Sequence, residues 1–156
     1  MSQPKTIEDR EYTKFVESPA RPNYSAVEVV VGNTAPIPVE IDQNVETDFA
    51  DGSVSAVLAI YKTLSGVKGG NNNTTIDEAT VIGISITGAS DGNKVKYKIM
   101  GSYTDSSFTF ALNAPIYLGT SGSLTSIAPS SGFRTQIGYS KGVGEIFINI
   151  QEPIIL

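Results

Sequence analysis

Residues 94–100 alternate strictly between polar and apolar side chains, reading Lys-Val-Lys-Tyr-Lys-Ile-Met. Successive side chains of a β-strand point to opposite faces, so this period puts the lysines on one face and Val95, Tyr97 and Ile99 on the other. A polar face opposite an apolar one is typical of a half-buried antiparallel strand. Because Asp91-Gly92-Asn93 is a turn signal, the sequence predicts a strand that begins just after this turn.

Other short apolar stretches between turn residues predict further strands. Residues 54–61 contain Ala and Leu that would suit a helix, but the shortness of the stretch and the Ser65-Gly66 turn after it favour a strand. Residues 69–73 are predicted as an exposed loop, since Gly and Asn tolerate positive φ. Strands at this spacing, with Gly, Ser and Asn in the turns, predict an all-β barrel or sandwich. The other predicted strands are 80–87, 108–112, 116–118, 134–140 and 145–150.

The chain also contains an internal echo. Residues 61–66 resemble residues 117–122 at an offset of 56, and residues 81–84 resemble residues 136–139 at an offset of 55. Two copies of one β unit are the simplest explanation. In each copy a glycine, Gly83 or Gly138, interrupts an apolar strand, where glycine commonly marks a bulge or a close backbone approach. We therefore expect residues 51–156 to form a small β-barrel built from two related hairpin units.

Residues 1–50 differ from this body and are predicted to form an extended N-terminal arm. Ten of the sixteen acidic residues precede residue 52. Pro19 and Pro22 favour a stiff, non-helical segment, and residues 25–41 hold one or two strands. Such an arm either wraps its own domain or docks on a neighbouring protein, and we expect it to bind a partner. The side chains that we expect to make this contact are Tyr12, Phe15, Val16, Arg21 and Tyr24.

Charge and composition argue against several classes of function. The net charge is −5 with no cluster of Lys or Arg, so we expect no direct binding to nucleic acid, whose phosphates attract basic patches. The sequence has no Cys and no His, which removes thiolate metal sites, the usual general base and the commonest metal ligand. The longest apolar run, residues 54–61, is far shorter than the roughly 20 residues of a membrane-spanning helix. We expect no cofactor, no membrane contact and no secretory signal.

Candidate catalytic motifs are weak. Ser140 lies next to Lys141, but such neighbours are common in a Ser-rich chain. The carboxylates of residues 51–156 lie mostly in turns, where Asp serves the backbone. Residues 119–122 lack the lysine and the following helix of a phosphate-binding loop. The alternating lysines of residues 94–98 are interpreted as a solvated strand face. The sequence therefore predicts a protein that is not an enzyme.

Several motifs resemble a domain of tailed-bacteriophage virion proteins, which is found in capsid decoration (cement) proteins and in fibre or collar proteins. Residues 8–19 and 25–29 are also similar to the leading segments of phage structural proteins. In the body the resemblance is carried by Thr80-Val-Ile-Gly-Ile84, Pro115-Ile-Tyr-Leu-Gly119, Gly122-Ser-Leu-Thr125, Pro129, Ser131-Gly-Phe133, Gln136-Ile-Gly138 and Ile146-Phe-Ile-Asn-Ile-Gln-Glu-Pro-Ile154.

The resemblance implies a small β-barrel or β-tulip-like domain assembled around a symmetry axis, as a homotrimer, with the N-terminal arm on the virion surface. It implies no catalytic residues. The expected function is a non-enzymatic virion structural protein, made in the bacterial host cytoplasm, that binds the major capsid protein or another virion protein and stabilises the assembled capsid. The alternative is a tail, collar or head-fibre component that contacts host surface glycans. Tyr103, Phe108 and Tyr139 are candidate glycan contacts, although aromatic residues on strands more often pack in the core.

Overall fold

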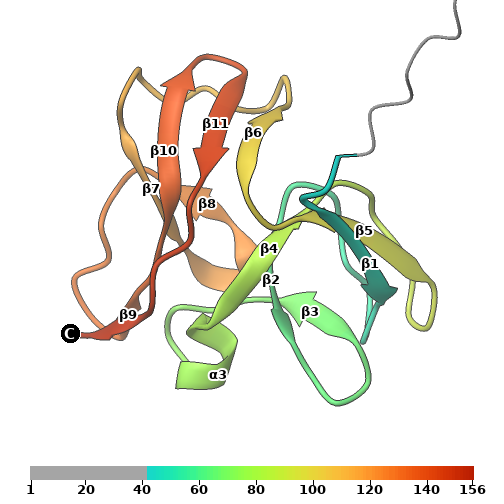
Figure 1. The fold of residues 1–156 in the computed structure, drawn as a ribbon. Coiled ribbons are helices and arrows are strands. Elements are labelled where there is room, and N and C mark those ends of the chain that lie inside the picture. Colours follow the sequence, from blue (N-terminus) through green and yellow to red (C-terminus); the bar gives the residue numbers. More distant parts are fainter. Residues whose placement is uncertain (1–41) are drawn as a thin grey trace, which may run out of the picture. The chain divides into compact units, whose positions relative to one another are not determined.

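Strands dominate residues 42–156, the part of the chain that the computed structural model describes (Figure 1). The prediction of an all-β protein is confirmed, but the antiparallel sheets are not closed into a barrel. The described unit begins at Asp42, so residues 45–49, which the sequence analysis placed in the arm, form a strand of its first sheet. The expected partner-binding side chains Tyr12, Phe15, Val16, Arg21 and Tyr24 lie outside the described residues.

Two five-stranded sheets and one two-stranded sheet make up this unit. The first sheet, in the order β1-β5-β4-β2-β3, contains β1 (Val45–Phe49), β2 (Ala59–Lys62), β3 (Val67–Gly69), β4 (Val81–Ser85) and β5 (Lys94–Lys98). The second sheet, in the order β6-β11-β10-β7-β8, contains β6 (Gly101–Thr104), β7 (Pro115–Leu118), β8 (Leu124–Thr125), β10 (Gln136–Gly142) and β11 (Glu145–Ile148). The small elements are the helices α3 (Ile76–Ala79) and η2 (Thr120–Gly122) and the paired strands β9 (Phe133–Arg134) and β12 (Ile154–Ile155).

The two large sheets have the same topology, strand for strand. We call residues 45–98 the first β unit and residues 101–148 the second β unit. Ile60 pairs with Gly83 in the first unit, and Ile116 pairs with Gly138 in the second. In both ladders the register shifts by one residue directly before the glycine. A bulge at the same place in both sheets is what two copies of one unit would produce.

The turn before the second strand of each unit is also shared. Val57 and Asn113 both have a φ of 64°, the left-handed region that non-glycine residues rarely occupy. The amide of Val57 donates to the carbonyl of Ser85, and that of Asn113 donates to the carbonyl of Ser140. Ser85 and Ser140 are both fully buried. The backbone therefore makes the same left-handed turn in both units. Asn113 adopts this conformation readily, whereas Val57 is strained by it.

The central strand β4 of the first sheet is buried on both faces. Its inner face packs into a core made within the first unit, and its other face packs against the core of the second unit. Because strand side chains alternate between faces, Ala59 and Ile60 point into different cores. Figure 1 shows β4 and β2 lying between the second sheet and the outer strands β1 and β3. The buried members of the first core are Ala50, Val54, Ile60, Val67, Val95 and Tyr97.

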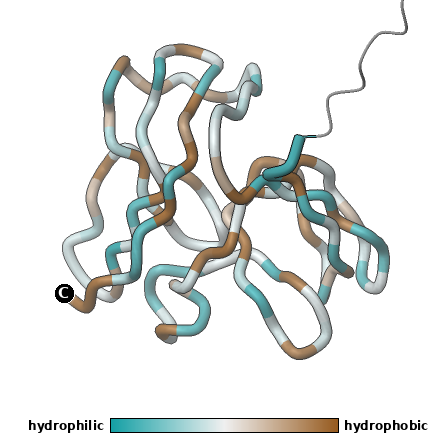
Figure 2. Tube along the Cα trace, in the orientation of Figure 1, coloured by the Kyte–Doolittle hydropathy of each residue, from teal (hydrophilic) through white to brown (hydrophobic). Residues whose placement is uncertain are grey.

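The second core is larger and joins the two units. Ala59, Val81 and Ile84 of the first sheet cover the inner face of the second. Both faces of β4 are therefore apolar, and Figure 2 shows hydrophobic positions where the two units meet. The buried members contributed by the second unit are Tyr103, Phe108, Ile116, Leu118, Ile137, Ile146 and Ile148.

Strand β5 confirms the prediction from its alternating pattern. Val95 and Tyr97 are buried, while Lys94 and Lys96 are exposed. The hydroxyl of Tyr97 donates to a carboxylate oxygen of Glu46 at 2.9 Å, which joins β5 to β1. Burial and this hydrogen bond raise the pKa of Tyr97 to about 12. The alternation therefore placed each side chain on the correct face.

Three local predictions are wrong. Of the strand predicted over 54–61, residues 54–58 form no strand, because the chain turns at Val57 and β2 begins only at Ala59. Residues 108–112 contain no strand, because the chain turns there to bring Phe108 into the core. The loop at 69–73 is not fully exposed, since Asn72 is only 8% exposed and its carbonyl accepts from the amide of Phe133. After this loop a short helix, α3, begins at a cap that the sequence analysis did not use: the Thr75 hydroxyl accepts from the amide of Glu78 at 3.3 Å.

The two equivalent glycines lie against the neighbouring strand. A Cβ added at Gly83 would lie 2.8 Å from the carbonyl oxygen of Lys98, and one at Gly138 would lie 1.9 Å from that of Phe147. Neither contact can be accommodated without separating the strands. This is the close backbone approach that the sequence pattern suggested.

Replacing Gly138 with Ala is therefore expected to lower the free energy of unfolding by about 3 kcal/mol, the upper range of overpacking costs. Urea denaturation of the purified protein measures this change. Gly69→Ala is the matched control, because its added Cβ would meet nothing closer than 3.4 Å. Equal losses in the two variants would show that the contact at Gly138 does not constrain the fold.

The left-handed turn gives a second prediction. Asn113→Val should lower the free energy of unfolding by about 1–2 kcal/mol, because a β-branched side chain is strained at positive φ. Asn113→Gly, which keeps the conformation accessible, should change stability little. Thermal unfolding of the two variants checks the difference, and an Asn113→Val protein as stable as the glycine variant would refute it.

Candidate functional site

The outer face of the second sheet carries a row of apolar side chains on neighbouring strands. Tyr139 lies opposite Pro115 on one side and Phe147 on the other, and Phe147 lies opposite Ser102. The rings of Tyr139 and Phe147 stack, with centroids 5.4 Å apart and planes inclined by 22°. Tyr139 is 41% exposed. The row is therefore an aromatic strip on the surface, held in position by the ladder of the sheet.

Charged side chains border this strip at one end. The Lys141 ammonium lies 2.7 Å from a carboxylate oxygen of Glu145 and 3.1 Å from the Ser102 hydroxyl. The hydrogen bond from Lys141, and then that of Ser102, hold the pKa of Glu145 below its ordinary value. Both charges are solvent-accessible, so the pair orders the border of the strip without contributing much stability.

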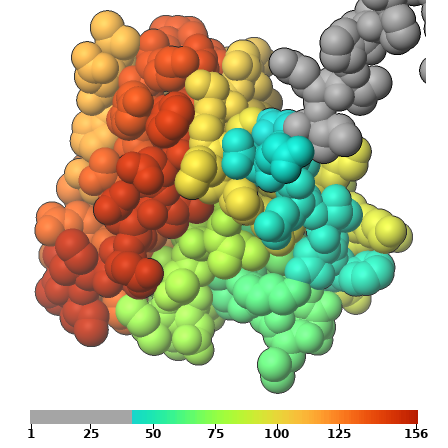
Figure 3. Space-filling view, in the orientation of Figure 1, coloured from blue at the N-terminus to red at the C-terminus, as the bar shows by residue number. Residues whose placement is uncertain are grey.

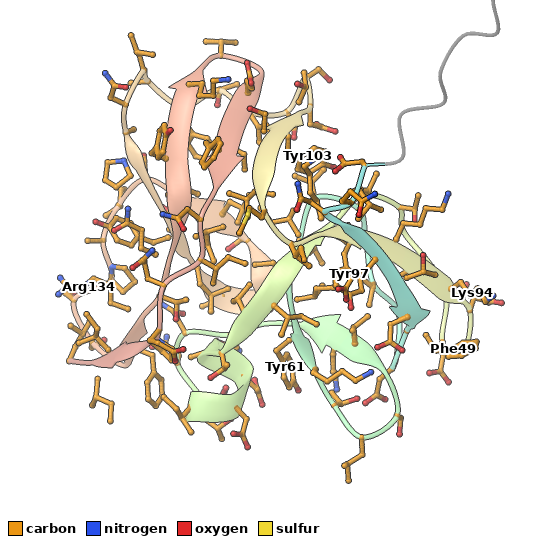
Figure 4. All side chains as sticks on the ribbon, in the orientation of Figure 1. Phe49, Tyr61, Lys94, Tyr97, Tyr103 and Arg134 are labelled. Atoms are coloured by element: carbon orange, nitrogen blue, oxygen red, sulfur yellow. The ribbon has the colours of Figure 1, made fainter. Side chains whose placement is uncertain are left out.

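A shallow polar recess borders the strip at the other end. It has a volume of about 470 Å³ and lies where Tyr117 and Gln136 face each other across β7 and β10. Figure 4 places Arg134 at the end of the molecule that holds the C-terminus. Among the described residues, Arg134 forms no ion pair. The recess is lined by Tyr117, Arg134, Gln136, Gln151, Glu152 and Ile154.

The corresponding face of the first sheet is covered at β2 and β4, whereas on β5 it carries Lys94, Lys96 and Lys98, the last being the counterpart of Phe147. Because the β2–β4 and β7–β10 ladders have the same register, each residue of the outer face of β2 and β4 has an equivalent residue on β7 and β10. The three residues of the first sheet are at most 6% exposed, whereas their counterparts in the second sheet reach the surface. In Figure 3 the orange and red second unit forms one side of the surface and is not overlain there by the first unit. The equivalent residues are Ala59 and Pro115, Val81 and Gln136, and Ile84 and Tyr139.

We call the residues Pro115, Gln136, Tyr139 and Phe147 the outer strip. It combines an aromatic centre with a polar, charged rim, which is the composition of protein-binding surfaces. Within residues 42–156 there is no group of three or more acidic side chains placed to hold a metal ion. No helix of these residues is long and apolar enough to cross a membrane.

The structure separates the residues that the sequence analysis had grouped as glycan contacts. Tyr103 and Phe108 pack edge to face at 5.4 Å in the second core, so they do not reach the surface. Tyr139 does reach it. Phe147, its stacking partner, was missed, although the pattern Glu-Ile-Phe-Ile over 145–148 alternates and pointed to one exposed aromatic residue. The Ser140 hydroxyl is buried and donates to backbone carbonyls, away from any nucleophilic role.

No known protein-family profile matches the sequence, and no curated protein is significantly similar to it. Function is therefore inferred from the residues and from the outer strip.

The exposed stack should be a binding feature rather than part of the core. The double variant Tyr139→Ala, Phe147→Ala is expected to lose about 1 kcal/mol of stability, the usual worth of an aromatic pair. Phe108→Ala, which empties a site only 2% exposed, should lose about 3–5 kcal/mol. Chemical denaturation compares the two, and a similar loss in both would place the stack in the core instead.

Proposed function

We propose that this protein is a non-enzymatic structural protein of a tailed-bacteriophage virion that decorates and stabilises the assembled capsid. The observation that carries the proposal is the outer strip, an aromatic surface whose counterparts on β2 and β4 of the same chain are covered. A rigid domain with an uncovered apolar face suits assembly with other proteins. Three of the motifs that resemble virion proteins, in residues 115–119, 136–138 and 146–154, include parts of the strands that build this face, β7, β10 and β11.

Stabilisation of the capsid follows from mass action. A protein that binds the assembled shell, and not the free subunits, shifts the equilibrium toward the shell as its concentration rises above the dissociation constant. In this proposal the N-terminal arm contacts the major capsid protein or another virion protein through Tyr12, Phe15, Val16, Arg21 and Tyr24. The described unit then stands on the capsid surface and contacts its neighbours there.

A second candidate is a tail, collar or head-fibre component that contacts host glycans. The polar recess favours it, because a tyrosine ring edge, a guanidinium and two amide side chains can hydrogen-bond a sugar. The stacked rings of Tyr139 and Phe147 face each other, however, and so offer fewer free ring faces for sugar stacking. We therefore rank capsid decoration first.

The copy number in purified particles distinguishes these two functions. A number comparable to that of the major capsid protein, measured by quantitative mass spectrometry, supports decoration. A small fraction of it supports the tail or collar, and absence from the particle contradicts both.

The role of the arm is tested by deleting residues 1–24 and measuring co-sedimentation with empty capsids. The affinity should fall at least about tenfold, which corresponds to 1.4 kcal/mol of binding energy. Val143→Ser, at an exposed hairpin tip, is the control and should bind like the unaltered protein. Undiminished binding of the deletion variant would mean that the arm is not the capsid contact.

A further inference from the structure

The contact between the two β units occurs once within each chain. The outer face of the first sheet, through Ala59, Val81 and Ile84, covers the inner face of the second sheet. Under this cover Ile137 and Ile148 are completely buried. This contact is head to tail, because the outer face of one unit meets the inner face of the other.

The first unit has counterparts of the two covered isoleucines. Ile82 is the bulged residue before Gly83, as Ile137 is before Gly138. Ile99 follows the residue that pairs with Ile84, and Ile148 follows the residue that pairs with Tyr139. These are the same positions in the duplicated ladder.

Within residues 42–156 the counterparts are only partly covered. Ile82 and Ile99 pack against the first core but are only partly buried. Met100 beside them is 52% exposed. The three side chains form one side of a recess of about 230 Å³, and residues 149–153 of the same chain form the other side. We call Ile82, Ile99 and Met100 the uncapped cluster. Among the described residues 42–156, the outer strip thus covers no other unit, and the uncapped cluster is covered only in part.

We propose that a second copy of this chain fills both gaps, with the outer strip of one copy docked on the uncapped cluster of the next. The contact repeats between chains the packing that already joins the two units within a chain. The side chains of the outer strip are larger and more amphipathic than Ala59, Val81 and Ile84. This difference suits a surface that is exposed to water before assembly and buried after it.

Charge favours this occupant. The rim of the outer strip has two basic side chains, Arg134 and Lys141, and two acidic ones, Glu145 and Glu152. These charges cancel, so the rim adds no net charge to a contact between copies of a chain whose net charge is −5. Glu152 lines both this rim and the recess at the uncapped cluster. Nucleic acid would require a strongly basic surface, and this rim is not basic.

The geometry determines the type of assembly. Two different patches meet, so the interface is heterologous, and it closes into a ring or continues as a filament according to the rotation between copies. The inference goes beyond the proposed function, since it assigns the outer strip to a neighbouring copy and leaves the arm for the capsid. It is tested on purified protein without capsids, so either proposal can fail alone.

Light scattering after size-exclusion chromatography of the full chain, over a range of concentrations, measures the assembly. We expect a molar mass at least twice that of one chain. The strip variant Tyr139→Ser, Phe147→Ser and the cluster variant Met100→Lys should both be monomers. Thr80→Lys, an exposed residue of the same recess, is a second cluster variant should Met100→Lys fold poorly. Val143→Ser, at an 81% exposed position of the β10–β11 hairpin turn outside the outer strip, should assemble like the unaltered protein.

Mixing the strip variant with a cluster variant gives the decisive result. The strip variant keeps an intact cluster and the cluster variant keeps an intact strip, so one functional interface remains. A one-to-one dimer is expected from two monomeric proteins. A mixture that stays monomeric, an unaltered protein that is monomeric at every concentration, or cluster variants that assemble normally would each overturn the proposal.

Discussion

The packing of the first sheet onto the core of the second is the contact on which the rest of the structure depends. Neither sheet is closed, and strands of two to seven residues offer little area within one sheet. Apolar burial, at about 25 cal/mol per Å², is the main favourable term in folding. The first sheet therefore contributes to two cores at once. Thr135, fully buried, reinforces this contact by donating its hydroxyl to the carbonyl of Ala79 at 2.7 Å.

Much of the fold follows from local patterns in the sequence. The alternation in residues 94–98 predicted both the strand and its buried side, and the two echoed glycines predicted where each ladder would be interrupted. The prediction of a closed barrel was wrong, because no local pattern shows whether a sheet closes on itself. Residues 81–85 read as apolar on both faces, and a period of two shows that a face is buried without showing what buries it. The partner of that face is another sheet, set by contacts distant in sequence.

The candidate site was visible only in part. Tyr139 stood out as an aromatic residue on a strand, but its exposure depends on the absence of a cover over the second sheet, which no local pattern records. Tyr103 lies inside because it pairs with Ile146 on the inner face of the second sheet, and Phe108 lies inside because the chain turns at 105–108. The arm, with its expected contacts, lies outside the described residues. The duplicated topology allows a comparison within one chain. A face that is buried in the first unit identifies the equivalent face of the second unit as one that another protein could cover.

The strained turn at Val57 has a consequence for folding. Its left-handed conformation is costly for a β-branched side chain, yet that side chain packs against the second core. The cost is offset only when the second unit is in place. The first unit therefore depends on its sister for a favourable backbone, and we expect the two to melt in a single cooperative transition. The two units share a topology but are unequal, because only the first places a β-branched residue in the left-handed turn.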